Sequence, residues 1–570
     1  MNLLQILNAK ELRALSFLFL GSTLTLGLEI LAIIIFLILT SFLVSSTGGN
    51  ELTGFRETAL NILTFNTSSR ELKVGLLVAE ITMIYVFKNI VGYSNILILN
   101  KLISKIQNRI SEIVYAKFFQ LPFRKMESIE TNKASAALID SINPAIAGQI
   151  SFVLLGLTEL LNISTIFIVL ATQNTKVTLI FIVFCLSLVF FTYKYLRNKA
   201  VANGANLYNS TLASRTYFSQ GKESISIFAL SGHLPFLLEN LNRERRKYSH
   251  AYLNSISLQQ LPKYLIESYL IFALFFLYVV TQLFSSSEST MQFILIFLLA
   301  GFRILPSITK LQSLWLTVSD SKHRIDSFFK LYSLVNEESL DTQSSNPYRV
   351  EMPPHLRVER IVGSEINFSY NGRIILQNLD FDTNFGSMVL VKGPSGSGKT
   401  TLLKIISGLI SPDSGSVNIH LSDGSIYEAA NFPYMVGYAP QTPMIFKGSV
   451  ARNILLSDLL NEIELEKIKT SLALVDTSGK WPTSSLHEEL IDLGGTNLSG
   501  GEKQRLNIAR AVAMGSNLII MDEPTNSLDS TTADEIISKL ASFSKNHNRI
   551  IFLTTHQHEL HTHFQSIIEL

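Results

Sequence analysis

The sequence is poor in cysteine and in charge. Cys185 is the only cysteine among 570 residues, which excludes a disulfide within the chain and a cysteine-based zinc site. We interpret Cys185, inside an apolar run, as a small core or lipid-facing residue. Charged residues make up only 16% of the chain, and 47 basic against 45 acidic residues give a net charge of +2. This balance argues against a nucleic-acid-binding protein, which would normally present a dominant basic face.

Apolar residues are abundant, at 47%, and they concentrate in the first 320 residues or so. Six runs come near the roughly 20 residues that a helix needs to cross a bilayer. They lie at about 15–45, 73–98, 147–172, 177–196, 263–284 and 291–312. The first is too long for the apolar part of a signal peptide, so we expect a retained anchor.

The remainder of the chain has the composition of a soluble α/β domain. We therefore predict an all-α membrane domain of six helices over 1–335, a polar linker over 336–354 and an α/β domain over 355–570.

Two long polar connections, about 99–146 and 197–262, are rich in lysine and arginine. Because cytoplasmic loops carry the excess of these residues, we predict that both connections and both chain termini are cytoplasmic. Apolar residues at helical spacing predict that the membrane helices continue into both connections. Their turns, about 121–130 and 217–230, would then contact the soluble domain; solvated loops are the alternative.

Ionisable residues interrupt the apolar runs, which is costly in lipid. Glu29, Glu159 and Glu267 are candidates to line a polar translocation cavity. Pairing between helices, or a position nearer the interface, is the alternative. Six hydrophobic helices with a few polar points favour a bulky amphipathic cargo over a small ion.

Residues 387–409, SMVLVKGPSGSGKTTLLKIISGL, have the pattern of strand, glycine loop and helix. This context predicts a P-loop, in which backbone N–H groups at the start of a helix bind phosphate. Lys399 would reach the β- and γ-phosphates of ATP, and the Thr400 hydroxyl would bind Mg²⁺. The expected ATP-binding residues are Gly393, Pro394, Ser395, Gly396, Ser397, Gly398, Lys399, Thr400 and Thr401.

The sequence NLIIMDEP, at 517–524, is an apolar strand that ends in two carboxylates. We expect Asp522 to hold Mg²⁺, directly or through water, and Glu523 to orient or deprotonate the water that attacks the γ-phosphate. The strand IIFLTTH places His556 at a strand end that faces the same crevice. We do not expect His556 and the histidines that follow it to form a metal site, because no set of acidic and cysteine ligands accompanies them.

The motifs YAPQ (438–441), LSGGEKQR (498–505) and NSLD (526–529), with those above, resemble the nucleotide-binding domain of an ABC ATPase over about 355–570. The resemblance implies that Tyr370 stacks on adenine and that Gln441 reaches Mg²⁺ and the attacking water. It also implies that His556 contacts the γ-phosphate and that Asp529 communicates across a dimer interface. Catalysis would thus rest on Glu523, with His556, Gln441 and Lys399.

The signature turn, Ser499, Gly500 and Gly501, stands at a predicted helix start suited to a γ-phosphate. By the same resemblance, that phosphate belongs to the ATP on the P-loop of the opposite subunit. One chain would then complete neither site. Because this chain carries an intact P-loop, Glu523 and signature turn together, we favour a homodimer with two equivalent sites over a heterodimer with a related half-transporter.

The whole chain resembles a half-transporter of the ABC exporter type. Local similarities at Leu28–Glu29, LPKYLIE (261–267) and FRILPS (302–307) are most like lipid-linked oligosaccharide flippases. The resemblance implies ATP-driven export or flipping of a lipid-linked oligosaccharide or polysaccharide precursor across a bacterial cytoplasmic membrane. Export of a lipid or a peptide, or an ATPase that regulates a partner without transport, are the alternatives.

Three departures from the exporter pattern stand out. Leu493 replaces the acidic residue that exporters usually carry before the signature, which puts the usual signalling contact in doubt, although Asp492 is adjacent. Pro524 and Asn526 replace the usual alanine and serine. The sequence stops at SIIEL, so the last hairpin usual in the family is expected to be missing or minimal. None of these changes removes a group needed for hydrolysis.

Overall fold

The computed structural model describes most of the chain. The described residues are 6–48, 58, 60, 62–64, 67, 69–173, 175–284, 287–341, 349–370, 372–457, 461–476, 479–482, 485–488, 491–514 and 517–570. They form two compact units, which we call the helical unit (Met1–Phe119 and Ile129–Glu337) and the α/β unit (Gln120–Ser128 and Glu338–Leu570). The α/β unit therefore includes a short segment from between two of the long helices.

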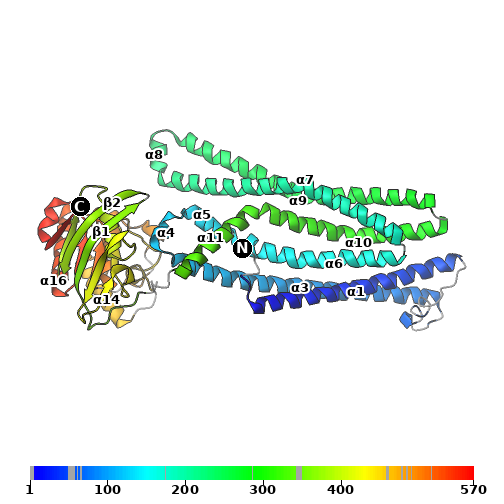
Figure 1. Cartoon of the computed structure of the whole chain (residues 1–570), viewed down its shortest axis with the longest axis horizontal. Coiled ribbons are helices and arrows are strands. Elements are labelled where there is room, and N and C mark those ends of the chain that lie inside the picture. The colour runs from blue at the N-terminus through cyan, green and yellow to red at the C-terminus, as the bar shows by residue number, and fades with distance from the viewer. Residues whose placement is uncertain are drawn as a thin grey trace. The chain divides into compact units, whose positions relative to one another are not determined.

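The helical unit is built from long helices that lie side by side (Figure 1). These are α1 (Ala9–Gly48), α3 (Arg70–Phe119), α6 (Gln149–Gln173), α7 (Thr175–Glu223), α9 (Leu234–Phe284) and α10 (Ser287–Asp320). Shorter helices follow or join them: α5 (Thr131–Ser135), η2 (Ala136–Asp140), η3 (Pro144–Gly148), α8 (Ile225–Leu230) and α11 (Lys322–Asp341). As the helical spacing predicts, α3 and α7 continue far into the two polar connections.

Four helical segments among the described residues are long and apolar enough to cross a membrane. They are Ala9–Phe36, Arg70–Phe119, Pro144–Thr172 and Phe181–Glu223. The fifth and sixth predicted spans lie in α9 and α10, where many side chains fall outside the described set, and they stay predictions. The predicted linker overlaps the end of α11, and its residues 342–348 lie outside the described chain.

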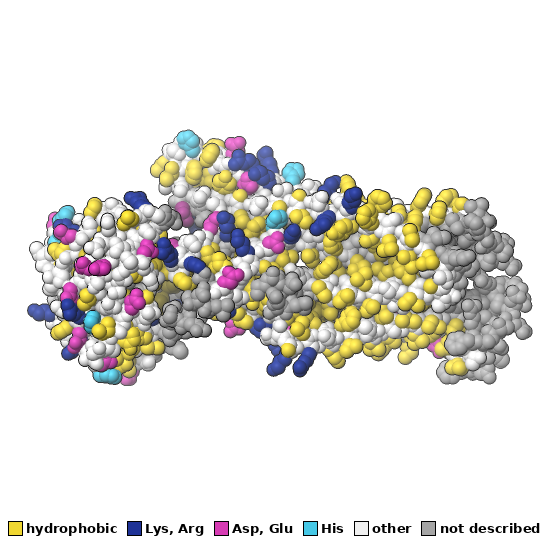
Figure 2. All heavy atoms as spheres, in the orientation of Figure 1, with side chains coloured by type: hydrophobic (Ala, Val, Ile, Leu, Met, Phe, Trp, Pro, Cys, Tyr) yellow, Lys and Arg dark blue, Asp and Glu magenta, His cyan; other side chains and the backbone are white. Residues whose placement is uncertain are grey.

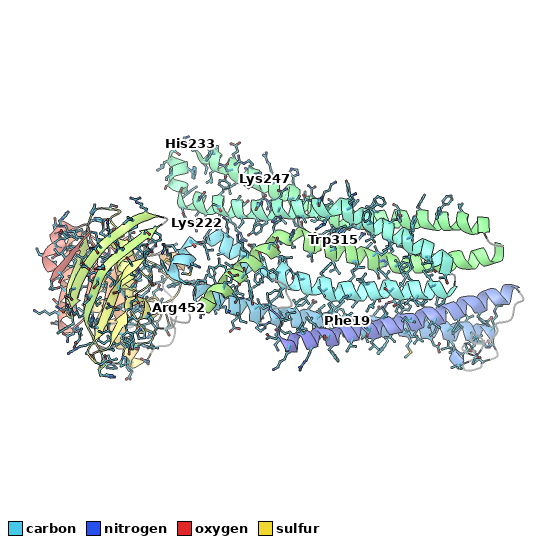
Figure 3. All side chains as sticks on the ribbon, viewed as in Figure 1. Phe19, Lys222, His233, Lys247, Trp315 and Arg452 are labelled. Carbon is cyan, nitrogen blue, oxygen red and sulfur yellow. The ribbon has the colours of Figure 1, made fainter. Side chains whose placement is uncertain are left out.

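Hydrophobic side chains gather over the right-hand part of the long helices on the face shown in Figure 2, whereas Lys and Arg side chains lie along their left-hand part. Phe17, Met83 and Phe191 are 73%, 76% and 68% exposed. Large apolar side chains exposed over a continuous surface mark contact with a membrane or a partner. Inside the unit, Trp315 of α10 lies among the helices, with its ring centroid 4.8 Å from that of Tyr193 on α7 (Figure 3).

Two sheets form the α/β unit. The antiparallel sheet has the order β2-β1-β4-β5, with β1 (Val358–Tyr370), β2 (Arg373–Asn384), β4 (Ser414–Leu421) and β5 (Ile426–Glu428). The parallel sheet has the order β6-β7-β8-β3-β9, with β3 (Met388–Lys392), β6 (Gly437–Ala439), β7 (Leu518–Met521), β8 (Ile550–Leu553) and β9 (Ser566–Glu569). Strands β7 and β8 are buried throughout and read as continuous apolar runs, which is typical of parallel strands covered on both faces.

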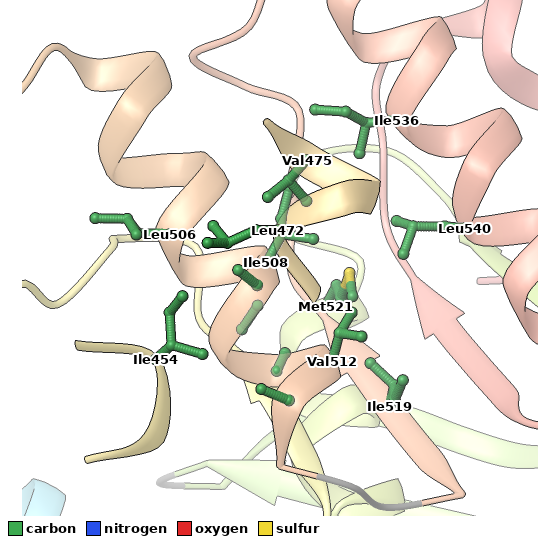
Figure 4. Packing of buried hydrophobic residues seen from close by; sticks show 14 of the residues in the cluster. Ile454, Leu472, Val475, Leu506, Ile508, Val512, Ile519, Met521, Ile536 and Leu540 are labelled. Atoms are coloured by element: carbon green, nitrogen blue, oxygen red, sulfur yellow. The ribbon is translucent and has the colours of Figure 1, made fainter. Parts of the chain in front are cut away.

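Helices pack on this parallel sheet and supply the core. They are α12 (Lys399–Ile406), α13 (Val450–Leu455), α14 (Glu462–Val475), α15 (Gly500–Ala513) and α16 (Ser530–Asn546). One apolar cluster joins α13 to α16 with one face of the sheet, and Figure 4 shows its centre around Leu472, Ile508 and Met521. A second cluster lies between α12 and the antiparallel sheet. Both clusters fix the parallel strands, whose carboxyl ends meet at one edge.

Candidate nucleotide-binding and catalytic site

The P-loop connects β3 to α12, as the sequence predicts. Gly396 and Gly398 have φ values of +82° and +100°, where residues with a side chain are rarely found. A Cβ atom on Gly398 would lie 2.8 Å from Cγ2 of Ile375, so this position requires glycine for space as well. Such alternation of backbone conformation forms concave nests of N–H groups that bind anions. The loop therefore has the geometry of a phosphate cradle.

Lys399 is folded back over this loop. Its side chain is largely buried, and Nζ donates hydrogen bonds of 2.9 Å to the carbonyl oxygens of Gly393 and Pro394. The buried Oγ of Ser397 has no hydrogen-bond partner among the described atoms. A buried hydroxyl without a partner is costly unless a ligand completes it. The ammonium group and the orphaned hydroxyl both fit phosphate oxygens.

Asp522 links the loop to the ends of β7 and β8. Its carboxylate accepts hydrogen bonds from Oγ1 of Thr400 (2.7 Å) and Oγ1 of Thr554 (2.8 Å), and the residue is 2% exposed. A carboxylate beside a hydroxyl provides oxygen ligands of the kind that Mg²⁺ prefers, so Thr400 and Asp522 could hold this ion. The described residues contain no group of three or more His, Cys, Asp and Glu that could hold a metal by themselves.

Glu523 is held by polar side chains from three strand ends. Oε2 accepts hydrogen bonds from Nε2 of Gln441 (2.9 Å) and from Nδ2 of Asn526, and Oε1 lies 3.0 Å from Nε2 of His556. Its φ is +48°, a strained value for a residue with a side chain. The hydrogen bond from its N–H to Oγ1 of Thr554 (2.8 Å) helps to hold that conformation.

Burial raises the pKa of Glu523, but the hydrogen bonds from Gln441 and Asn526 and the nearby His556 outweigh it and hold the pKa below its ordinary value. The carboxylate is therefore ionised at neutral pH and can accept a proton.

Sequence reasoning placed Glu523, Gln441 and His556 in this site, and the structure brings them together. It missed Asn526, which was noted only as a departure; its position three residues after Glu523 was the available signal.

The signature turn caps α15. Oγ of Ser499 accepts from the N–H of Glu502, and the two glycines that follow pack against Ser527: a Cβ on Gly501 would lie 3.2 Å from its carbonyl oxygen. Asp529 caps α16 by accepting from the N–H of Thr532 (2.9 Å). Hydrogen bonds from Thr531 and Thr532 hold the pKa of Asp529 well below its usual range. In the described chain, no hydrogen bond or ion pair joins this turn to the P-loop.

Tyr370, the predicted adenine contact, lies at the end of β1 against α4 (Phe123–Ser128). Its hydroxyl donates to Oε2 of Glu127 (3.3 Å), and Glu127 also pairs with Nζ of Lys404 (3.0 Å). Arg124 forms an ion pair of 3.3 Å with Asp413. The turn predicted at 121–130 therefore contacts the soluble domain. The turn predicted at 217–230 contains α8 and belongs to the helical unit.

Charged residues inside the helical unit pair across helices. Glu29 of α1 accepts from Lys88 of α3 (2.7 Å) and from Arg303 of α10. Glu159 of α6 accepts from Lys310 of α10 and from Ser307, both at 2.7 Å. For these two glutamates, the interhelical pairing that the sequence left as an alternative is what the structure shows.

Glu159 also lines a cavity of about 380 Å³ between α1, α3, α6 and α10. Its walls combine hydroxyl, amide and ammonium groups with leucines, and its polar residues are Ser22, Thr25, Lys88, Asn89, Asn95, Thr158, Glu159, Asn162 and Lys310. Glu29 and Glu267 are absent from this wall among the described residues.

The chain has the fold of an ABC exporter, in which a helical domain is followed by a P-loop ATPase domain, and its α/β unit has the parts of a nucleotide-binding site. Residues 376–526 match the ABC transporter family, a match that implies ATP binding. The solved structure of a bacterial Atm1-family ABC exporter with ATP bound has the same fold, with a TM-score of 0.75, 17% identity, and coverage of 99% of this chain and 94% of that one.

Two curated relatives show how far the sequence similarity extends. The mesentericin-Y105 transport/processing ATP-binding protein MesD of Leuconostoc mesenteroides is 24% identical over 528 residues, or 90% of this chain and 69% of that protein. The chloroplastic ABC transporter B family member 29 of Arabidopsis thaliana is 31% identical over 224 residues, or 38% of this chain. The match spans only 35% of the length of that second relative.

Proposed function

We propose that two copies of this chain form an ATP-driven exporter that moves an amphipathic cargo across a bacterial cytoplasmic membrane, with both termini in the cytoplasm. The observation that carries the proposal is the convergence of Lys399, Asp522 and Glu523 at one edge of the parallel sheet. This set serves phosphoryl transfer, and it stands on the same chain as helices long and apolar enough to span a membrane.

The residues divide the chemistry among them. Lys399 and the P-loop amides neutralise and position the phosphates, and Glu523 accepts a proton from the attacking water. Gln441 and His556, which already contact the Glu523 carboxylate, orient that water. When bound, Mg²⁺ supplies charge neutralisation at the phosphate oxygens; Thr400 and Asp522 would hold it, and Gln441 would join them.

A lipid-linked oligosaccharide or polysaccharide precursor is the cargo we favour. The cavity beside Glu159 has the mixed lining that suits a molecule with a polar part and an apolar part, and its volume of about 380 Å³ would hold one segment of such a molecule. A peptide is the second candidate, because MesD is named for transport of mesentericin.

The dimer can be tested by pairing inactivating changes in different ways. Lys399→Ala disables a P-loop and Ser499→Arg disables a signature turn. If each site is shared, a mixed dimer that carries one change on each subunit keeps one intact site, and one that carries both changes on a single subunit keeps none. ATP turnover of tagged, purified mixed dimers measures this. If sites were complete within one chain, the first dimer would be inactive and the second would hydrolyse ATP.

Cargo can be tested in proteoliposomes, by measuring ATP turnover across a panel of undecaprenyl-linked sugars, lipids and peptides. We expect stimulation by the lipid-linked sugars. Stimulation by peptides alone would replace the favoured cargo with the second candidate. ATP hydrolysis without movement of any cargo would contradict the transport proposal and favour a regulatory ATPase.

A further inference from the structure

The first turn of α15 already carries a negative charge of its own. The N–H of Ser499 donates to Oε2 of Glu502 (2.8 Å), and the N–H of Glu502 points back to Oγ of Ser499 (3.3 Å), which makes a capping box. The Glu502 side chain is only 14% exposed. Its carboxylate therefore lies beside the turn where the proposed function places a γ-phosphate.

Two negative groups at one helix start compete for the same N–H donors and repel each other. A glutamine at this position would form the same capping box without charge, so the cap alone does not explain the carboxylate. Something must offset the charge of Glu502 if ATP is to enter the turn.

Lys480 provides the offset. Its Nζ forms an ion pair with Oε1 of Glu502, the oxygen that does not make the capping hydrogen bond. Burial raises the pKa of Glu502, but the bonds from Lys480 and Ser499 outweigh it, and the net pKa is lowered. The carboxylate is thus charged at neutral pH and needs its counter-ion.

The position of Lys480 is fixed by the fold. Asp476, the C-cap of α14, accepts from the backbone N–H groups of Lys480 (3.2 Å) and Trp481 (3.0 Å). Trp481 is 7% exposed within the apolar cluster, and the guanidinium of Arg505 on α15 lies 5.7 Å from its ring centroid. The backbone at Lys480 is therefore anchored to both helices, although its side chain remains 45% exposed.

We propose that Lys480 is a positioning residue of the shared ATP site: it holds Glu502 in its capping position and cancels its charge, so that the γ-phosphate bound to a second copy can enter the signature turn. This inference rests on the proposed function. It predicts that the harm done by losing Lys480 comes from the uncompensated Glu502 rather than from a missing contact of Lys480 itself.

Rescue tests this directly. In the full-length protein, Lys480→Met should raise the KM for ATP about 5- to 20-fold with kcat within about twofold, because the charge opposes phosphate entry rather than the chemical step. Glu502→Gln keeps the capping box and should leave KM unchanged or lower. The double variant should return KM to within about twofold of the unmodified protein. Lys480→Arg, which keeps the charge, should behave like the unmodified protein.

Lys539→Met is the matched control, because Lys539 pairs with Glu535 (2.6 Å) on the surface of α16; its KM should not change. A Lys480→Met variant with the unmodified KM, or a double variant as impaired as the single, overturns the inference. If Lys480→Met folds poorly, Lys480→Gln carries the same prediction: its KM should rise, and adding Glu502→Gln should restore it. Absence of ATP turnover in the unmodified protein would instead contradict the proposed function.

Discussion

The two units use charged side chains in opposite ways. In the α/β unit, Lys399, Asp522 and Glu523 converge at one edge of a sheet, and among the described contacts Lys399 meets backbone carbonyls rather than an acid. In the helical unit, Glu29 and Glu159 are each neutralised by cations from other helices.

The difference follows from what each surrounding can compensate. A charge in a membrane helix is costly unless another side chain neutralises it, so pairing is needed for the helices to assemble. A ligand site instead keeps charges that its ligand will satisfy, at some cost to stability. In this chain, the paired glutamates hold helices together, whereas the acids of the candidate site are held by hydroxyl, amide and imidazole groups and Lys399 by backbone carbonyls.

The largest effect should come from the convergent set. We expect Glu523→Gln to lower ATP turnover by about 10²-fold or more, because it removes the group that accepts the proton from water. ATP binding should persist, since the P-loop and Asp522 are unchanged, and thermal stability should hold or rise. Steady-state hydrolysis and nucleotide binding measure the two effects separately.

Glu559→Gln is the control, because Glu559 is an exposed acid in the same unit. It should hydrolyse ATP at the unmodified rate. If Glu523→Gln hydrolysed ATP at close to the normal rate, another group would have to accept the proton from water. The charges that converge in the α/β unit would then not be explained by catalysis at Glu523.

The paired charges should fail in a different manner. Glu29→Gln removes the carboxylate that Lys88 and Arg303 share and leaves two cations facing each other. We expect a loss of about 3 kcal/mol of stability, the size found when one partner of a buried pair is removed. The thermal midpoint and the monodisperse yield in detergent should both fall.

Lys88→Met is the matched comparison, because Glu29 keeps Arg303 as its partner. Its midpoint should fall less than that of Glu29→Gln. Equal midpoints for both variants and the unmodified protein would mean that the pairing does not stabilise the helices, and a role of Glu29 in cargo contact would become the better explanation.

The α/β unit was more predictable from sequence than the helical unit, for a physical reason. Phosphate chemistry fixes residue types at short spacings, so the P-loop and the acids after β7 could be placed from the chain alone. Parallel strands then bring their carboxyl ends together, which predicted that His556 would face the same crevice; the structure adds its contact with Glu523.

Pairing across membrane helices has no such local signature. Glu29 and Arg303 are 274 residues apart, and only the packing of α1 against other helices decides which cation a glutamate meets. The cavity beside Glu159 was likewise unpredictable in its membership, since four helices contribute to its wall. Asn526 was missed although its position three residues after Glu523 was available, because an amide side chain has several possible partners.

The smallest predicted effect distinguishes a helix cap that only stabilises its helix from one that also binds phosphate. Helices α14 and α15 both begin with a capping box, at Asn461 and Ser499. Replacing either with alanine should cost about 1 kcal/mol of unfolding free energy. Asn461→Ala should leave ATP turnover unchanged, whereas Ser499→Ala should also raise the KM for ATP, because its hydroxyl belongs to the proposed phosphate site. Thermal melts and ATP titrations of the two variants, made side by side, check this. If the KM for ATP were the same in both variants, Ser499 would act only as a helix cap, like Asn461. The glycine N–H groups alone would then bind the phosphate at this turn.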